Sequence, residues 1–128
     1  MTPLNPASLP APFGRYSHGV EVPAKGRLVK TSGQLALASD LSIPESAFEQ
    51  AQLIFQYLDA ILQEGNMSRQ DVIHLAAYVT DRAYMKEYMQ ARDLYFGELT
   101  PPASTLIIVS GFTREEFKVE IELLAMAD

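Results

Sequence analysis

The most regular hydrophobic pattern in the chain lies between Ala47 and Leu62, where apolar residues recur every three or four positions. This spacing gathers them on one face of an amphipathic α-helix. Ser42 and Glu45, three residues apart, predict a capping box before the helix. Gly65 predicts its end, because glycine often follows the last helical turn.

A second helix is predicted after Asp81, whose side chain is well suited to cap a helix N-terminus. Gly97 is expected to end it. The apolar side chains of this segment recur at helical spacing and are interpreted as core, and its two methionines as packing residues rather than part of a cofactor site. The stripe consists of Met85, Tyr88, Met89, Tyr95 and Phe96.

Five segments have the composition or the alternation of β-strands. They are His18–Val22, Leu28–Leu37, Val72–Thr80, Thr105–Ser110 and Lys118–Ala125. The first two flank a turn around Pro23 and Gly26, which predicts a β-hairpin. The fourth is predicted as a buried strand. The last alternates strictly, with its valine, isoleucine and leucine on one face and its charged residues on the other.

The order of elements is therefore β-β-α-β-α-β-β, which predicts an α+β fold with one mixed sheet and two helices on one face. Residues 1–13 contain four prolines and are expected to form an extended segment ahead of a single domain over residues 14–128. Since no third helix is available for the other face of the sheet, that face is expected to be covered by further subunits.

The chain has 128 residues, a formal net charge of −6 and no cysteine. Disulfides, a thiol nucleophile and thiolate metal ligands are thereby excluded, and with its two histidines in separate strands no metal site is predicted. The acidic balance argues against nucleic acid and anionic membranes as partners, because both attract lysine and arginine. No signal peptide or membrane span is predicted, so a cytoplasmic location is expected.

Two strands carry polar side chains that could form a site. A period of two places Lys30, Ser32 and Gln34 on one face of their strand, and Glu120 and Glu122 on one face of theirs. If these faces meet at a subunit boundary, they would form a small polar cleft that positions a water or a polar ligand. The alternative is a solvated face or a structural ion pair.

Four short motifs, in this order along the chain, resemble the Rid (YjgF-like) family of reactive intermediate deaminases. They are Gly14–Val20 (GRYSHGV), Thr31–Gln34 (TSGQ), Pro102–Thr105 (PAST) and Lys118–Glu122 (KVEIE). The resemblance implies a chorismate-mutase-like fold and a homotrimer with clefts between adjacent subunits. It also implies cofactor-free hydrolysis of imines and enamines, such as 2-aminoacrylate, to a keto acid and ammonia.

The resemblance assigns Tyr16 to the wall of the cleft, Ser32 to the substrate's surroundings, and Glu120 to holding and polarising the attacking water. Ser104 and Thr105 follow as substrate-binding residues. At Ser104 the family's active deaminases have an arginine that pairs with the substrate carboxylate, and a hydroxyl cannot replace that forked cation. The usual arginine-dependent deamination of 2-aminoacrylate is therefore not expected.

Two other cations could compensate from different walls of the cleft. Lys30 shares the predicted face of Ser32, and Arg15 adjoins Tyr16; the alternatives are an ion pair with a glutamate for Lys30 and a surface position for Arg15. Three functions stay open: a divergent imine or enamine hydrolase using Glu120, a non-catalytic trimer that binds a small metabolite or a protein, and, less favoured, an endoribonuclease or translation inhibitor.

Overall fold

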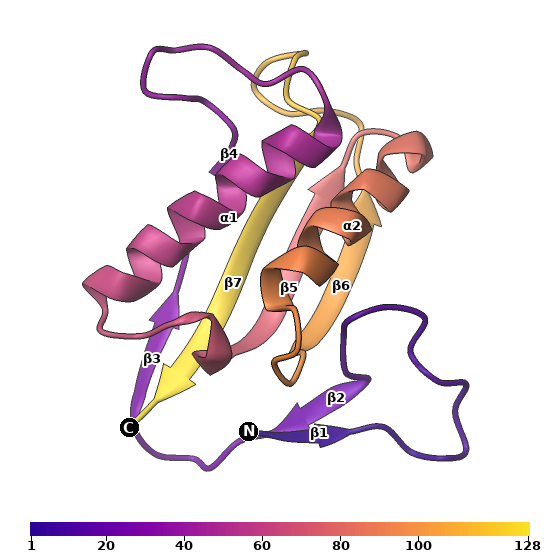
Figure 1. The fold of residues 1–128 in the computed structure, drawn as a ribbon, viewed down its shortest axis with the longest axis vertical. Coiled ribbons are helices and arrows are strands. Elements are labelled where there is room, and N and C mark those ends of the chain that lie inside the picture. Colours follow the sequence, from indigo (N-terminus) through magenta and orange to yellow (C-terminus); the bar gives the residue numbers. More distant parts are fainter.

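The computed structural model describes residues 1–128 and contains two α-helices, two short 3₁₀ turns and seven strands (Figure 1). The helices are α1 (Ala47–Glu64) and α2 (Met85–Phe96), and the 3₁₀ turns are Arg69–Asp71 and Arg82–Tyr84. The strands are β1 (Thr2–Leu4), β2 (Gly19–Glu21), β3 (Arg27–Lys30), β4 (Gln34–Leu35), β5 (Val72–Val79), β6 (Ala103–Ile108) and β7 (Val119–Ala127).

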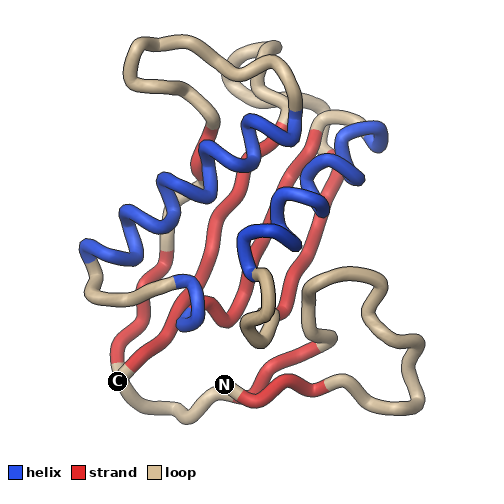
Figure 2. Tube along the Cα trace, in the orientation of Figure 1, coloured by secondary structure: helices blue, strands red, loops and turns tan.

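The main sheet has five strands in the order β3-β7-β5-β6, with β4 also paired to β7. β5 and β6 run parallel, while β7 is antiparallel to its neighbours β3, β4 and β5, so the sheet is mixed. Figures 1 and 2 show both helices on one face of this sheet. The predicted α+β class, with two helices on one face, is confirmed.

The core lies between the helices and the sheet face that they cover. In β7, Val119, Ile121 and Leu123 point to the helices and are at most 1% exposed, as the alternation predicted. Ile54 and Leu58 of α1 are fully buried against this layer. The apolar periods of helix and strand thus place their buried faces together, and the hydrophobic effect holds them there.

The ends of the helices differ in part from the prediction. The capping box between Ser42 and Glu45 does not form; Ser46 caps α1 by accepting a hydrogen bond from the Glu49 N–H at 3.0 Å. Ser42 instead bonds to Asp40 in the preceding turn. Asp81 does act as a cap, but of the 3₁₀ turn that leads into α2.

The predicted hairpin between the first two strands is wrong. β2 pairs with β1, in a small two-stranded sheet outside the main one, and the proline-rich start of the chain is tied down by that pairing. β3 pairs with β7 instead of β2. The turn around Pro23 therefore connects two sheets and not two paired strands.

The segment predicted as one strand over Leu28–Leu37 is two strands with a register shift between them. Lys30 is opposite Leu124 whereas Gln34 is opposite Ile121, so the pairing slips by one residue across Thr31–Gly33. A one-residue slip turns the following side chains to the other face. Lys30 and Gln34 hence point to opposite faces, which corrects the prediction that they share one.

β6 is less buried than predicted, because it forms an edge of the sheet. Ile107 and Ile108 are 48% and 44% exposed, and Thr105 is also exposed. Met85, predicted as core, is 36% exposed at the start of α2, whereas Met89 packs against the core. The sheet face away from the helices has no covering layer within the chain (Figure 2).

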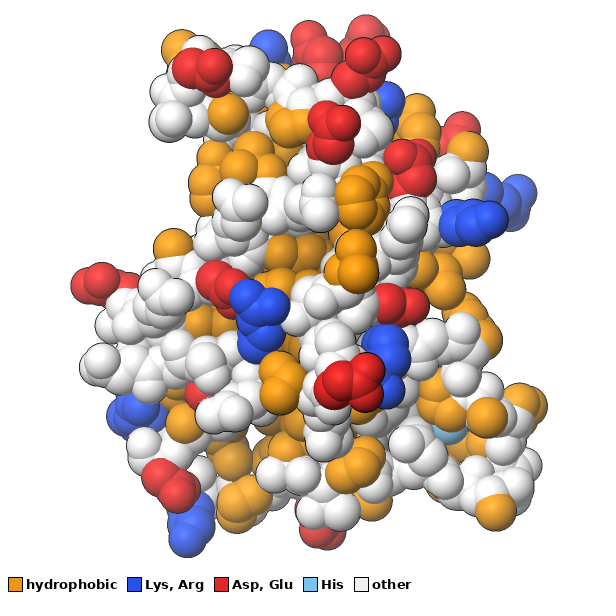
Figure 3. Space-filling view, viewed as in Figure 1, with side chains coloured by type: hydrophobic (Ala, Val, Ile, Leu, Met, Phe, Trp, Pro, Cys, Tyr) orange, Lys and Arg blue, Asp and Glu red, His pale blue; other side chains and the backbone are white.

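The surface on the helix side carries charges of both signs. Figure 3 shows basic side chains distributed over this side together with acidic ones, with no large basic patch. Neither helix combines the length and the hydropathy needed to cross a bilayer.

Candidate functional site

The sheet separates the predicted site residues into two groups. Glu120 is opposite Tyr78 in the register and points to the open face, away from the helices. Ser104 is opposite Leu75, a core residue, and so points to the helix side. Thr105, the next residue of β6, points to the opposite face, which is the open one. We call the first group the open-face cluster (Lys30, Gly33, Tyr78, Glu120, Glu122) and the second the helix-side pocket (Phe13, Tyr16, Met89, Arg92, Ser104).

Three members of the open-face cluster form a paired network. Lys30 Nζ lies 2.5 Å from Glu122 Oε2, and the Tyr78 hydroxyl donates to Glu122 Oε1 at 2.5 Å. The hydrogen bonds from Lys30 and Tyr78 lower the pKa of Glu122, and the same bond to Glu122 raises the pKa of Tyr78. Lys30 is therefore engaged in an ion pair, one of the two roles that the sequence left open.

Glu120, the predicted water-holding residue, differs from its neighbour Glu122. Burial raises the pKa of its carboxyl, and the negative charge of Glu122 raises it further. No hydrogen bond or ion pair engages its carboxylate within the chain. A carboxylate with a raised pKa and free oxygens is a stronger base than an exposed one and is suited to activating water.

Gly33 lies close to that carboxylate and leaves space for it. A Cβ atom on Gly33 would lie 2.0 Å from Glu120 Oε1, so no larger residue fits beside Glu120 as it stands. Both residues line a cavity of about 360 Å³ on the open face, together with Tyr78 and Gly111. Ser32, next in the chain, is exposed and its carbonyl accepts from the Gln34 side chain at 3.2 Å.

The helix-side pocket brings Tyr16 and Ser104 together from segments far apart in the sequence. Ser17 donates through its N–H to Pro102 O at 2.8 Å and through its hydroxyl to Pro101 O at 2.5 Å. These bonds hold the segment containing Tyr16 beside the start of β6. The pocket has a volume of about 270 Å³ and is walled mainly by apolar and aromatic side chains.

Arg92 also lines this pocket and was not among the residues predicted from the sequence. It lies on α2 and is only 4% exposed, with its guanidinium 5.5 Å from the Tyr16 ring and 5.8 Å from the Tyr88 ring. The sequence did contain an indication that Arg92 is buried, because it lies four residues after Tyr88 and so falls within the apolar stripe of the helix. A charge on a buried helix face requires a partner or a function.

Arg15, the other candidate cation, is held elsewhere. Its Nη2 donates to Leu99 O at 2.5 Å, and its backbone N–H donates to Asp93 Oδ1 at 3.1 Å. It does not line the helix-side pocket. Its interactions support the attachment of the Tyr16 segment to the end of α2.

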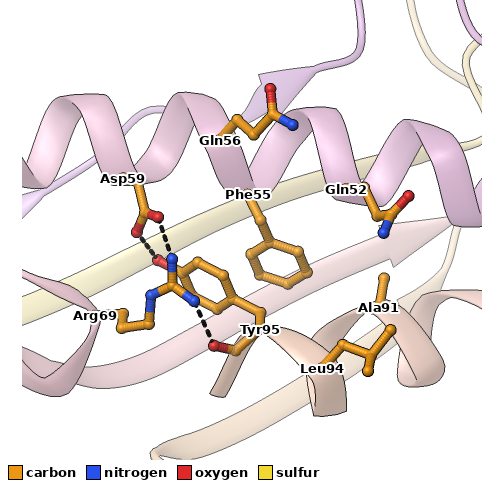
Figure 4. A pocket seen from close by; sticks show the side chains of 8 residues that line it. All are labelled: Gln52, Phe55, Gln56, Asp59, Arg69, Ala91, Leu94 and Tyr95. Carbon is orange, nitrogen blue, oxygen red and sulfur yellow. Dashed lines mark hydrogen bonds and ion pairs between the residues drawn. The ribbon is translucent and has the colours of Figure 1, made fainter. Parts of the chain in front are cut away.

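A further pocket lies between the two helices (Figure 4). Asp59 and Arg69 form an ion pair there, the Tyr95 hydroxyl donates to Asp59 at 2.5 Å, and Arg69 donates to Tyr95 O at 2.8 Å. Because these polar groups bind one another, as the dashed lines in Figure 4 show, we assign them to the packing of α1 against α2. No group of three or more metal-ligating side chains forms in the structure.

Comparisons with known proteins identify the family. A family model described as Endoribonuclease L-PSP matches residues 7–127. A RutC family protein of Aquifex aeolicus is 30% identical over 128 residues, covering 98% of this chain and 99% of its own. The Escherichia coli protein named "Putative reactive intermediate deaminase TdcF" is 28% identical over 120 residues, covering 91% and 90%.

Solved structures show the same fold. A Rid family protein of unknown function, YyfB from Yersinia pestis, superposes with a TM-score of 0.85 at 22% identity, over 98% of this chain and 97% of its own. RidA from an Antarctic Psychrobacter species gives a TM-score of 0.74 at 27% identity, over 92% and 93%. The likeness spans nearly the whole length of each chain.

Proposed function

Since the chain belongs to the Rid (YjgF-like) family, we propose that it is a cofactor-free hydrolase of small imines or enamines, working in a cleft between the protomers of a homotrimer. The observation that carries this proposal is the state of Glu120: its carboxylate has a raised pKa, makes no hydrogen bond or ion pair within the chain, and lies beside Gly33 on a face that the chain itself leaves uncovered. The reactive intermediate deaminase named among its relatives supports the same reaction class.

The two-sided geometry supports a cleft shared between protomers. Glu120 faces away from the helices, whereas Tyr16 and Ser104 lie on the helix side at the β6 edge. A site that uses both groups requires the edge of one protomer to meet the open face of another. Such contacts would also cover exposed Ile107 on β6.

The reaction needs little more than a placed water and a base. The enamine first takes a proton at carbon and loses one from nitrogen to become the imine. Water then adds to the C=N carbon, and Glu120 accepts its proton and passes it to the nitrogen, which gives a carbinolamine. The hydroxyl of the carbinolamine loses its proton as the nitrogen gains one, the C–N bond breaks, ammonia leaves, and a carbonyl forms. No electrons are exchanged with another reactant, because the imine carbon is already electrophilic; the protein contributes orientation and proton transfer.

Replacing Glu120 by glutamine tests this role. The substrates are several small imines and enamines generated in situ, including 2-aminoacrylate from serine by a dehydratase, with carbonyl and ammonia as the readout. We expect Glu120→Gln to lower kcat/KM by about 100- to 10,000-fold, the usual contribution of a general base. Light scattering on the same preparations is expected to give the mass of three chains.

Glu122→Gln is the matched control. It keeps most of the activity at neutral pH but moves the acid limb of the pH profile to lower pH, because a negative charge that raises the pKa of Glu120 is gone. Unchanged turnover in Glu120→Gln would contradict the mechanism, and a monomer would contradict the shared cleft. If the wild-type protein turns over no imine at all, a non-catalytic trimeric binding module, which the loss of the family arginine at Ser104 favours, becomes the better account.

The family description raises a second activity, RNA cleavage. The net charge of −6 and the scattered basic side chains argue against it, since RNA affinity depends on clustered lysine and arginine. Salt-sensitive RNA binding at physiological ionic strength would favour the nuclease instead.

A further inference from the structure

The connection between β6 and β7 runs beyond the end of the sheet (Figure 1) and has no role in the reaction described above, yet it borders the cavity that holds Glu120. Val109 and Phe112 from this connection line that cavity of about 360 Å³, together with Tyr78. Phe112 also lines a second cavity of about 360 Å³, to which Glu120 does not belong. A side chain that lines both cavities lies between them, so Phe112 is part of the wall of the Glu120 cavity.

Both ends of this connection are held by hydrogen bonds. At its start, the Val109 N–H donates to Val79 O at 2.8 Å. At its end, Gln50 of α1 donates through Nε2 to Glu116 O at 2.8 Å and accepts through Oε1 from the Lys118 N–H at 2.8 Å. Gln50 is fully buried, and a buried amide that is bonded through both its nitrogen and its oxygen is a fixed support. The two ends of the connection are therefore fixed in place.

The residues between these ends are held differently. No backbone–backbone hydrogen bond involves residues 110–113. Ser110, Gly111 and Thr113 are exposed, and a Cβ on Gly111 would meet nothing within 4 Å. Phe112 is the exception, because it is half-buried and lines both cavities. The burial of one apolar ring is therefore the main interaction that holds this part of the connection against the Glu120 cavity.

An apolar ring in this wall suits the role that we propose for Glu120. Phenylalanine offers no hydrogen bond to the carboxylate, so both carboxylate oxygens stay available to water. Its surface also replaces part of the surrounding water, and burial is the main cause of the raised pKa of Glu120. The polar neighbours Tyr78 and Glu122 bind each other instead. Phe112 thus limits the solvent around the base without engaging it.

We propose that Phe112 is a positioning residue that covers the Glu120 cavity, holds the imine against the water that Glu120 activates, and keeps other water away. Excluding bulk water strengthens the interactions inside a site and leaves one placed water to react. The inference rests on the proposed function, because the base that is covered is Glu120. Its first test, however, needs no turnover.

The first test introduces a tryptophan into the full chain at this position. The chain contains no tryptophan, so the emission of Phe112→Trp comes from the cavity wall alone. A protonated carboxyl group quenches indole fluorescence more strongly than a carboxylate does. Since the pKa of Glu120 is raised, we expect the emission to change with pH in a transition above the pH at which an ordinary glutamate titrates. The double variant Phe112→Trp/Glu120→Gln should lack this transition.

Thr113→Trp is the matched control. Thr113 is the next residue, is exposed, and lines the second cavity but not the Glu120 cavity. Its emission is expected to show no transition that depends on Glu120. A transition of Phe112→Trp that survives Glu120→Gln, or one that Thr113→Trp shares, would contradict the inference.

The second test is kinetic. We expect Phe112→Ala to lower kcat/KM by about 10- to 100-fold, mainly through kcat, because the imine and the water are less well placed. The acid limb of the pH profile should move to lower pH, because water then reaches Glu120 and its pKa falls. Phe112→Leu keeps an apolar side chain and should recover most of both properties, while Thr113→Ala should leave the rate unchanged. A Phe112→Ala protein with the wild-type kcat and pH profile would overturn the inference.

The two tests separate this inference from the proposed function. If turnover depends on Glu120 while Phe112→Ala behaves as the wild type and Phe112→Trp does not report Glu120, the hydrolase stands and the cover fails. If Phe112→Trp reports the titration of Glu120 but no imine is hydrolysed, the ring does cover Glu120 and the proposed reaction fails.

Discussion

The polar side chains on the two sides of the sheet are paired differently. On the open face, Lys30, Glu122 and Tyr78 satisfy one another, and the hydrogen bonds hold the pKa of Glu122 below its usual range. On the helix side, Arg92 is buried and pairs with Asp93, while the hydroxyls of Ser104 and Tyr88 beside it make no hydrogen bond of good geometry. An exposed network is stabilised in part by water, whereas a buried charge depends on the few partners that the fold places beside it.

Glu120 stands between these cases. It belongs to the open face by position, but its carboxylate has no hydrogen-bond or ion-pair partner within the chain, whereas Arg92 pairs with Asp93. The negative charge of Glu122 nearby raises its pKa rather than neutralising it. The carboxylate that we assign to catalysis is thus one that the fold leaves unpaired, and the variants below test this distinction.

After Glu120→Gln, the largest effect is expected from Gly33→Ala. The new methyl group would lie 2.0 Å from Glu120 Oε1, so the carboxylate must move away from the water that it holds. A displacement of this size is expected to lower kcat/KM by about 100-fold. Gly111→Ala is the control from the same cavity, because its Cβ meets nothing within 4 Å. Equal rates in the two variants would remove Glu120 from the mechanism.

A smaller effect is expected from Tyr88→Phe. The Tyr88 hydroxyl is fully buried beside Ser104 and Arg92 and makes no hydrogen bond of good geometry. Its removal should change the free energy of unfolding by at most about 1 kcal/mol, measured by urea denaturation. A loss of several kcal/mol would show that the hydroxyl is a structural hydrogen-bond partner.

The smallest effect is expected from Lys30→Met on the open face. Lys30 is 56% exposed at its side chain, so water screens its pair with Glu122 and the loss should stay below about 1 kcal/mol. Because the folded state lowers the pKa of Glu122, the pair stabilises the protein above the unfolded-state pKa and the contribution disappears as pH falls through the lowered value. Wild type and variant should therefore converge in stability at acid pH, and a gap that widens there would contradict this account.

The sequence predicted the elements that have a clear period. α1 and the alternation of β7 are as expected, because a period of 3.6 or of two directly determines which side chains share a face. The pairing of β2 was not predictable in this way. The strand that follows β2 most closely in the sequence is β3, but β2 pairs with β1 at the proline-rich start of the chain. A local sequence pattern identifies a strand but does not determine which strand it pairs with.

The sequence predicted individual residues of the proposed site but not their arrangement. Tyr16, Ser104 and Glu120 came from short motifs, and their placement on two sides of the sheet became visible only with the register of β6 and β7. The prediction that Lys30 and Gln34 share a face was wrong, because a single-residue slip at Thr31–Gly33 reverses the alternation of side chains. The hydrophobic period of a sequence does not reveal such a slip.

The sequence by itself determined the α+β class, the buried faces of its helices and strands, the family motifs, and the absence of an arginine at position 104. Only the tertiary structure decided which cation takes part in the pocket beside Ser104. Lys30 and Arg15 are near the motifs in sequence but are bound to Glu122 and Leu99. Arg92 reaches the pocket because α2 packs over β6, and that proximity depends on packing in three dimensions rather than on any spacing along the chain.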